Sequence, residues 1–390
     1  MNELTRQYKT KTNYTLEDRA PHDGGAVNIA LDIGYSSCKG VSESGTFMFP
    51  SFAMKIPEGS RSVFGSSEKS DVIFHDHTTG EKWAVGELAL KMLKSGDVKE
   101  GKDALFGRDR YSSPLFRIIA STGLAIGLYP NTGGRVRLQT GLPPDYMLSD
   151  KPKLVSALAG DYDFSLKIGA GEEQLYRFHM DENDIYCMEQ PLGTLFALAS
   201  DRDGHIMPEA EELMKSNILI FDAGYGTLDI FSIQNGRVSP GANSTFDDLG
   251  MRTVFEKTVH KIHEQWGMEV SVPFLQNCLE DGRIRIMDRK TRSSRFEDFS
   301  SILVQCVEET AQAALERLDA NYGGLFETDI LVLAGGTSCA WDKIVREHYK
   351  DMETLKIVAG NKNTGLPGVF SNVKGYYARL LGAMRASGQK

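Results

Sequence analysis

Two aspartates near the ends of apolar runs are the first residues in this sequence suited to chemistry. Asp32 closes one run and is followed two positions later by Gly34, and Asp222 closes another and is followed by Gly224. Short apolar runs bounded by glycine are typical of buried strands, so each aspartate is expected at a strand end. A carboxylate in that place can hold a metal ion through water, and the glycine lets the backbone approach a ligand closely.

The segment 32–39 adds donors and a positive charge to the first aspartate. Consecutive backbone N–H groups in such a turn form a concavity that binds anions. Hydroxyl donors and a lysine charge suit phosphate, and the turn holds both. The candidate residues are Gly34, Tyr35, Ser36, Ser37 and Lys39. A hairpin with ordinary turn residues and no ligand is the alternative interpretation.

The segment 222–229 repeats this arrangement half a chain later. Its backbone amides and one threonine hydroxyl could cradle a terminal phosphate, while Asp222 binds Mg²⁺ or orients a water molecule. The candidate residues are Asp222, Gly224, Tyr225, Gly226 and Thr227. A glycine-rich hairpin turn is again the alternative.

A third candidate, Gly335-Gly336-Thr337, follows the apolar run 329–334. Adjacent glycines at a strand-to-helix junction let a nucleotide lie close to the backbone. Neither the dinucleotide-binding pattern GxGxxG nor the P-loop GxxxxGK[ST] fits these sites. All three segments stand in order at strand ends of one chain, which favours a nucleotide site over three unrelated turns.

Composition limits the function classes. The chain has 390 residues, of which 44 are basic and 53 acidic, giving a net charge of −9. A protein that coats nucleic acid normally carries a basic excess, so direct DNA binding is not expected. Five scattered cysteines without a CxxC pair, and an N-terminus without an apolar leader, predict a soluble cytoplasmic protein with reduced thiols.

The elements that must position these residues follow from hydropathy. Residues 1–25 are expected to form a flexible arm. Strands are predicted at 27–33, 38–42, 45–49, 135–140, 217–222, 227–233 and 329–334, with several more in 161–188. Helices are predicted at 83–93, 112–128, 249–266, 299–318 and 370–384, with another opening at Pro191. Two copies of one strand–turn–strand unit suggest two related lobes with a cleft between them.

The ordered set Asp32-x-Gly, Asp222-x-Gly-x-Gly-Thr and Gly335-Gly336-Thr337 resembles the phosphate-1, phosphate-2 and adenosine motifs of the actin fold. Four further segments resemble the bacterial plasmid-segregation actins of the ParM and Alp type. They are Trp83–Ala89, Thr140–Pro143, Asp248–Gly250 and Ser371–Tyr377. The resemblance covers residues 27–385, and the arm has no counterpart in it.

The resemblance implies an α/β actin-like fold of two lobes, each a mixed sheet flanked by helices, with nucleotide in the cleft. We expect lobe I at 26–190 and lobe II at 191–390, with the C-terminal helix returning to lobe I. The implied function is an ATPase that forms filaments and drives plasmid segregation. Its partners would be copies of itself and a DNA-binding adaptor on a centromere-like site, without a membrane.

The resemblance also assigns roles to residues. Asp32 and Asp222 would face Mg²⁺ and its waters, and Lys39 would reach the β and γ phosphates. The two glycine-containing hairpins would line the phosphates, and residues 335–337 would lie near the ribose and α-phosphate. ATP is the expected nucleotide, with GTP as an alternative.

The residue that orients the attacking water is expected where a helix begins. The segment Met188-Glu189-Gln190-Pro191 fits this position, with Gln190 in the better register and Glu189 as the alternative. A carboxylate is the stronger base, whereas a glutamine can only orient the water. The alternative is that Gln190 serves only as the N-cap residue of the helix.

A basic segment and a pair of histidines also allow both a functional and a simpler interpretation. The six basic residues between Arg283 and Arg295 suit a contact to DNA, an adaptor or a second subunit, but a solvated loop explains them as well. His75 and His77 could bind a metal ion or stand in an exposed turn. Competing functions are a small-molecule kinase of the same superfamily and a nucleotide-gated scaffold. No sugar-pocket signature and no amphipathic membrane tail is evident for either.

Overall fold

The computed structural model describes residues 3–17, 20, 25–59, 68–93, 107–201, 203–239, 241–287 and 293–388. The chain divides into two compact units. Unit 1 is built from Met1–Thr10, Leu93–Glu100 and Glu211–Ala359, and unit 2 from Lys11–Met92, Gly101–Ala210 and Gly360–Lys390. The division therefore falls at residue 210 rather than at the expected residue 190, and the last 31 residues, 360–390, belong to the unit that contains Asp32.

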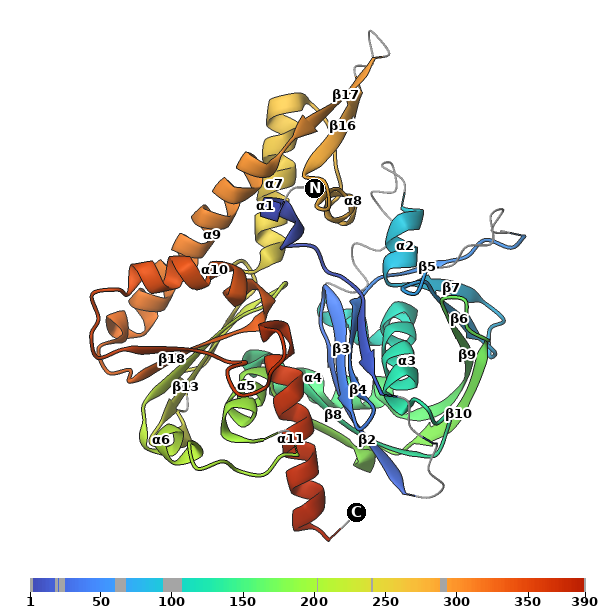
Figure 1. Cartoon of the computed structure of the whole chain (residues 1–390), viewed down its shortest axis with the longest axis horizontal. Helices are drawn as coiled ribbons and strands as arrows, with labels where there is room; N and C mark the ends of the chain where they lie inside the picture. The colour runs from blue at the N-terminus through green and yellow to red at the C-terminus, as the bar shows by residue number, and fades with distance from the viewer. Residues whose placement is uncertain are drawn as a thin grey trace. The chain divides into compact units, whose positions relative to one another are not determined.

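Unit 2 is organised around a mixed sheet of six strands in the order β1-β4-β3-β2-β8-β11. Figure 1 labels strands β2, β3, β4 and β8 of this sheet. The central strand β2 runs antiparallel to β3 and parallel to β8. All eight residues of β2 are buried, as expected for an apolar run in the middle of a covered sheet. The strands are β1 (Asn13–Leu16), β2 (Ala26–Ile33), β3 (Ser37–Ser42), β4 (Gly45–Pro50), β8 (Arg135–Leu142) and β11 (Ile185–Glu189).

Helices cover both faces of this sheet. Alternate residues of β2 point to opposite faces, so Ile29 and Leu31 join the core that contains helix α3 (Pro114–Leu128), while Ala30 joins a second cluster with helix α11 (Ser371–Ala386). Helix α11 crosses α5 (Gln190–Ala199) very closely. A Cβ added to Gly375 would lie 1.6 Å from the Gly193 carbonyl oxygen, so this crossing requires glycine.

A second sheet of unit 2 has the order β10-β9-β6-β7-β5. Its strands are β5 (Ala53–Lys55), β6 (Val72–Asp76), β7 (Lys82–Val85), β9 (Gly160–Ile168) and β10 (Gln174–Met180). The helix predicted from Trp83 to Leu93 is partly wrong, because residues 82–85 pair antiparallel with β5 and β6. Gly86, with φ +67°, ends that strand, and only α2 (Glu87–Met92) is helical. The remaining helix of the unit is α4 (Met147–Leu158).

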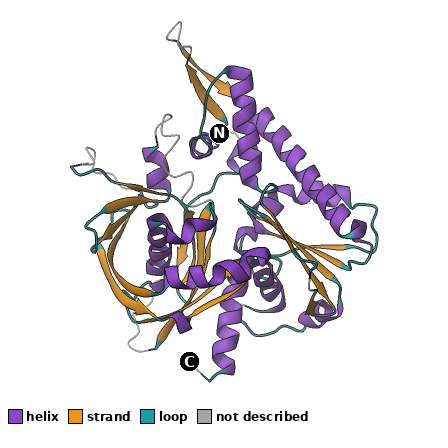
Figure 2. Cartoon of the chain, turned by 180° about the vertical axis from the view of Figure 1, so that it is seen from behind, coloured by secondary structure: helices purple, strands orange, loops and turns teal. Residues whose placement is uncertain are grey.

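Unit 1 contains a mixed sheet in the order β14-β13-β12-β18-β19, with β15 also paired to β13. Figure 2 shows the two long helices α7 and α9 side by side in this unit. The strands are β12 (Ile218–Ala223), β13 (Leu228–Gln234), β14 (Arg237–Val238), β15 (Ser244–Phe246), β18 (Ile330–Ala334) and β19 (Lys356–Ala359). The helices are α7 (Met251–Trp266), α8 (Val272–Cys278), α9 (Ser300–Asn321) and α10 (Gly335–His348), and α6 (Ala210–Lys215) spans the division between the units.

The basic segment of unit 1 is a β-hairpin rather than a loop. Arg283 and Arg285 lie on β16 (Arg283–Met287), and Arg295 lies on β17 (Ser294–Asp298), with the two strands antiparallel. The other basic residues predicted here, Arg289, Lys290 and Arg292, lie outside the described residues.

The N-terminal segment differs from the flexible arm expected at 1–25. Helix α1 (Glu3–Arg6) lies on unit 1, where the fully buried Thr5 donates its hydroxyl to the Leu279 carbonyl oxygen at 2.7 Å. Strand β1 then pairs with β4 in unit 2, from Asn13 opposite Met48 to Leu16 opposite Gly45. Residues 3–16 are thus held by a buried hydrogen bond and a strand ladder, which the polar composition of the segment did not indicate.

Candidate functional site

The first predicted hairpin is the β2–β3 connection of unit 2. Asp32 and Lys39 are direct cross-strand partners, and Lys39 Nζ lies 2.6 Å from Asp32 Oδ2. The turn is closed by a backbone hydrogen bond of 3.1 Å from Gly34 N to the Ser37 carbonyl oxygen. The structure therefore brings the acid, the lysine and the glycine turn together in one hairpin.

Helix α5 contributes the residue expected to orient water. Gln190 is its first residue, and Gln190 Nε2 donates to Asp32 Oδ1 at 3.4 Å, although the two residues are 158 positions apart. Glu189 is the N-cap residue of the same helix, and its side chain makes no capping hydrogen bond. Of the two candidates, Gln190 is the one joined to Asp32.

Arg110 is a residue of this region that sequence reasoning missed. Its guanidinium carbon lies 4.6 Å from the centroid of the Tyr35 ring in the hairpin turn, and its side chain is almost fully buried. Burial acts to lower the pKa of Arg110, but the neighbouring Tyr111 and Tyr35, and after them the charge of Asp32, raise it. A buried arginine over a hairpin tyrosine places a permanent positive charge near the candidate anion site. No sequence pattern signalled it, because Arg110 stands in a short 3-10 turn far from the motif.

The second predicted hairpin is the β12–β13 connection of unit 1. Gly224 N donates to the Thr227 carbonyl oxygen at 2.9 Å, which closes a turn of the same kind as in unit 2. Asp222 and Asp229 are cross-strand partners, and both are buried. Asp229 accepts hydrogen bonds from the hydroxyls of Thr227, at 3.0 Å, and Thr245, at 2.6 Å. Asp229 therefore stabilises the turn through these hydrogen bonds, while Asp222 lies near the end of β12.

The third motif lies directly against the second. Thr337 Oγ1 donates to the Gly224 carbonyl oxygen at 2.7 Å, and Ala223 N donates to Ser338 Oγ at 3.0 Å. Gly335 has φ +80°, and a Cβ there would lie 2.4 Å from the Ala223 carbonyl oxygen and 2.6 Å from Asp222 Oδ1. Gly335 is thus needed for the start of α10 to approach the end of β12.

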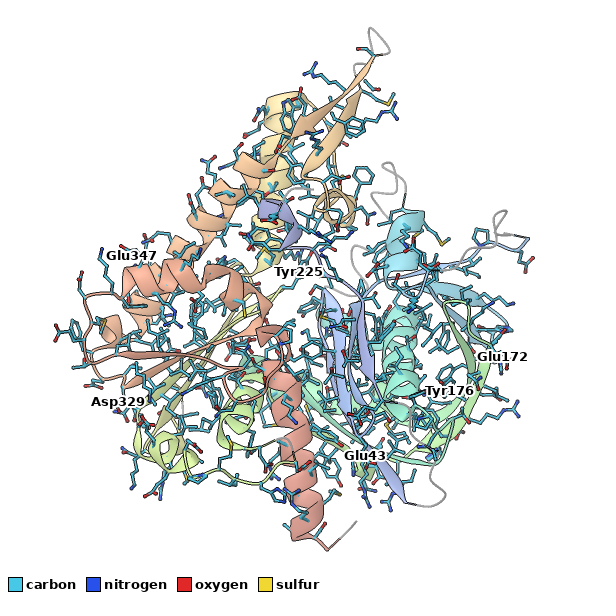
Figure 3. All side chains as sticks on the ribbon, in the orientation of Figure 1. Glu43, Glu172, Tyr176, Tyr225, Asp329 and Glu347 are labelled. Atoms are coloured by element: carbon cyan, nitrogen blue, oxygen red, sulfur yellow. The ribbon has the colours of Figure 1, made fainter. Side chains whose placement is uncertain are left out.

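Tyr225 differs from its expected place in a phosphate pocket. Its ring packs against Phe255, with ring centroids 6.0 Å apart, and its hydroxyl accepts a hydrogen bond from Gln276 Nε2 at 3.1 Å (labelled in Figure 3). Burial is the main cause that raises the pKa of this phenol. The side chain belongs to the core of unit 1, so only the backbone of Tyr225 remains available to line a ligand.

Each hairpin by itself carries one oxygen donor of the kind that Mg²⁺ prefers. Asp32 and Asp222 are hard oxygen donors at strand ends, and Mg²⁺ is usually held by one or two carboxylates together with waters and phosphate oxygens. A Cβ at Gly335 would lie 2.6 Å from Asp222 Oδ1. This carboxylate therefore lies beside a residue that has no side chain. Each carboxylate, taken within its own unit, is therefore of a type that can hold Mg²⁺.

The fold of this chain is similar to that of actin-like proteins. Residues 30–193 match the family model described as the N-terminal domain of actin-like proteins. Among curated proteins, none matches the chain.

Solved structures of the ParM and actin-homologue type share the fold. A 15-stranded ParM filament from Clostridium botulinum is 18% identical, with a TM-score of 0.69 and coverage of 92% of this chain and 99% of that one. A non-polymerisable quadruple mutant of pCBH ParM is 20% identical, with a TM-score of 0.68 and coverage of 90% and 98%. An archaeal actin homologue, Ta0583 in complex with ADP, is 16% identical, with a TM-score of 0.58 and coverage of 92% and 99%.

The chain thus resembles the ParM and Alp actin homologues and has their mixed α/β fold, as predicted from its motifs. Within the described ranges, no helix combines the length and the apolar character needed to cross a membrane.

Proposed function

We propose that this chain binds and hydrolyses ATP in the presence of Mg²⁺ and assembles into filaments. The observation that carries the proposal is the pair of hairpins that end in Asp32 and Asp222, each closed by the same backbone hydrogen bond from a glycine amide. The hydrogen bond from Gln190 to Asp32 supports hydrolysis rather than binding alone, because it places a water-orienting group beside the candidate metal ligand.

The proposed roles follow from the chemistry of each group. Asp32 and Asp222 would hold the Mg²⁺ through water, and the ion would supply charge neutralisation on the phosphate oxygens. Lys39 would leave Asp32 and donate to the phosphates, because a phosphate group offers the ammonium more negative charge than one carboxylate. The backbone N–H groups of Ser36 and Gly226, inside the two turns, would donate to phosphate oxygens in the manner of an anion-binding nest.

Gln190 would orient the attacking water. A neutral amide cannot take the proton as a carboxylate does, so its contribution is to align the water with the terminal phosphate. Thr337 would hold the Gly224 carbonyl in place and so keep the second hairpin in its phosphate-binding shape.

Filament formation is proposed by analogy with proteins of the same fold. The Clostridium botulinum ParM is described as a filament, and this chain covers 99% of its length. A head-to-tail contact between identical subunits does not close on itself, so it generates a filament.

Plasmid segregation is the biological role we propose, in the cytoplasm and with a DNA-binding adaptor. The net charge of −9 disfavours direct DNA binding by this chain, so a separate protein would link it to a centromere-like DNA site. A small-molecule kinase remains the second candidate from the sequence, but no described feature favours it.

The test is sedimentation and light scattering of the purified chain with ATP and Mg²⁺, together with phosphate release. We expect ATP-dependent pelleting and phosphate release without any added acceptor. An Asp222→Asn variant, which keeps the shape of the side chain and removes its charge, is expected to lose both. A chain that stays monomeric at tens of micromolar with ATP would contradict the filament, and phosphate transfer only to an added small molecule would favour the kinase.

A further inference from the structure

Two histidines and a glutamate lie together on the second sheet of unit 2, apart from the hairpin of Asp32. One donor atom of each of His75, His77 and Glu173 lies within 4.8 Å of the others. His75 Nδ1 is 3.4 Å from Glu173 Oε1, and the two imidazole rings are edge to face with centroids 5.0 Å apart. The nucleotide function proposed above uses none of these groups.

Strand alternation explains why these side chains share one face. His75 lies on β6 and His77 directly follows it, so both point away from the face of Phe74. The opposite face is an aromatic layer in which Phe164 stacks on Phe74 at 4.8 Å and on Tyr176 at 5.3 Å. Glu173 lies in the turn between β9 and β10, next to Glu172, and Figure 3 labels Tyr176 and Glu172 in this region. The stacked layer below gives the three polar groups a rigid support.

A neighbouring aspartate sets the tautomer of His77. His77 Nδ1 is 2.7 Å from Asp163 Oδ1, and His77 Nε2 is 2.8 Å from Ser165 Oγ. Arg177 Nε donates to the other oxygen, Asp163 Oδ2, at 3.0 Å. With Nδ1 directed at a carboxylate oxygen, Nε2 is the nitrogen that accepts from the Ser165 hydroxyl and could instead bind an ion.

We propose that His75, His77 and Glu173 form a binding site for a divalent transition-metal ion of the zinc class. Two imidazole nitrogens and one carboxylate oxygen are the ligand types that such ions prefer over Mg²⁺. The carboxylate–histidine pair of Asp163 and His77 is the arrangement that orients metal-binding histidines in proteins. Three protein ligands leave a fourth position for water or for a group from another molecule.

The site needs only side-chain movement to close on an ion. With metal–ligand bonds of about 2.1 Å, tetrahedral ligands lie about 3.4 Å apart, which is less than the 4.8 Å limit seen here. Glu173 is exposed and His75 is half-buried, so small rotations of their side chains can bring them together. His77 would exchange the Ser165 hydroxyl for the ion at Nε2 and keep its bond to Asp163.

The same sheet supplies a matched control. His179 on β10 is bonded through Nδ1 to Asp161 at 2.7 Å, the same pairing as His77 with Asp163. His179 is not among the grouped donor atoms. A His179→Ala variant therefore removes an exposed histidine–aspartate pair while leaving the proposed ligands intact.

The experiment is a titration of the full chain without nucleotide, using Zn²⁺ by calorimetry and Co²⁺ by its visible absorption. A Cys339→Ser background removes the exposed thiol as a competing ligand. We expect one ion per chain, with the Co²⁺ absorption typical of tetrahedral coordination. His77→Ala and Glu173→Gln should each weaken binding by at least ~10-fold, and Asp163→Asn by about 10–100-fold, as for other second-layer partners of metal ligands. His179→Ala should bind as the parent does.

Two outcomes would overturn the proposal. One is the absence of stoichiometric binding of either ion by the parent chain. The other is equal affinity in the His77→Ala and His179→Ala variants, which would place the ion elsewhere. Circular dichroism checks that each variant folds. We expect the variants to fold because these side chains lie on the solvent face of the sheet. Loss of the metal site would leave ATP-dependent pelleting unchanged, so the two proposals fail independently.

Discussion

Lys39 Nζ and Asp32 Oδ2 lie 2.6 Å apart, as cross-strand partners whose side chains are only 13% and 8% exposed. A pair this little exposed to water interacts more strongly than a surface ion pair. Gln190 holds the other oxygen of the same carboxylate at 3.4 Å. The charge of Asp32 is therefore compensated by residues of its own unit, and a bound phosphate would compete with it for Lys39.

Lys39→Met should weaken ATP binding. A hydrogen bond to a charged group contributes about 1.5–3 kcal/mol, and we therefore expect a loss of about 10–100-fold in affinity. The free energy of unfolding should also fall, because Asp32 loses its buried partner. Lys55→Met is the matched control, since Lys55 pairs with Glu81 on the exposed surface of the same unit. Fluorescent-nucleotide titration measures the affinity, and equal binding by both variants would remove Lys39 from the site.

Gln190→Ala should slow phosphate release with little loss of ATP binding. Positioned proton-transfer or water-orienting groups contribute about 100-fold or more to a rate, and we expect a decrease of at least that size. Single-turnover phosphate release, with nucleotide affinity measured in parallel, separates the two effects. An unchanged rate in Gln190→Ala with a slowed Glu189→Gln variant would move the role to Glu189.

Gly335→Ala should destabilise unit 1 and weaken nucleotide binding together. The new methyl would meet the Ala223 carbonyl oxygen and Asp222 Oδ1, and the backbone has φ +80°. Gly267 has φ +68° with nothing within 4 Å of an added Cβ, so Gly267→Ala measures the backbone strain by itself. That strain costs roughly 1–2 kcal/mol. We expect thermal unfolding to shift further for Gly335→Ala, and equal shifts would contradict the close approach of α10 to β12.

Thr5→Val should destabilise the chain by about 1 kcal/mol, the usual contribution of one buried hydrogen bond. The valine keeps the shape of the side chain but leaves the Leu279 carbonyl without the hydroxyl that now lies 2.7 Å away. Gln7→Ala is the control, because Gln7 is exposed and bonds only locally to the Leu4 carbonyl. Urea denaturation compares the two, and a neutral Thr5→Val would show that α1 contributes little to the stability of unit 1.

Two cysteines should react slowly with alkylating reagents in the folded protein. Burial is the main cause that raises the pKa of Cys278 from 9.0 to about 11 and that of Cys187 to about 12. The thiolate is the reactive form, so its fraction in folded Cys278 is about 100-fold below that in the unfolded chain near neutral pH. Mass spectrometry should find the exposed Cys339 modified first.

The raised pKa of Cys278 also predicts how the free energy of unfolding changes with pH. Between the unfolded pKa of 9.0 and the folded value of about 11, the unfolded Cys278 releases its proton while the folded one keeps it. The unfolded state then binds fewer protons, so stability falls as pH rises through this window. Urea midpoints should show a smaller fall in a Cys278→Ser variant, and an identical fall would assign the effect to other groups.

The sequence by itself determined the local units of this protein. An apolar run, an aspartate and a glycine turn encode a buried strand and a sharp hairpin within a few residues, so the turns at Asp32 and Asp222 were predictable. The proline at the start of α5 and the apolar periodicity of α3, α7 and α9 were predictable for the same reason, because burial and backbone geometry act over one or two turns. These local signals also carried the resemblance to actin-like proteins.

Only the tertiary structure decided which of these strands, turns and helices come into contact. The strand at 82–85 replaced a predicted helix because β5 and β6 supply hydrogen-bonding partners that no local pattern records. The bond from Gln190 to Asp32, the docking of Thr5 on Leu279 and the grouping of Glu173 with His75 join residues from 98 to 274 positions apart. Such contacts depend on packing between helices and strands. The local sequence pattern predicts which residues are buried and where the chain turns, but not which distant residues come into contact.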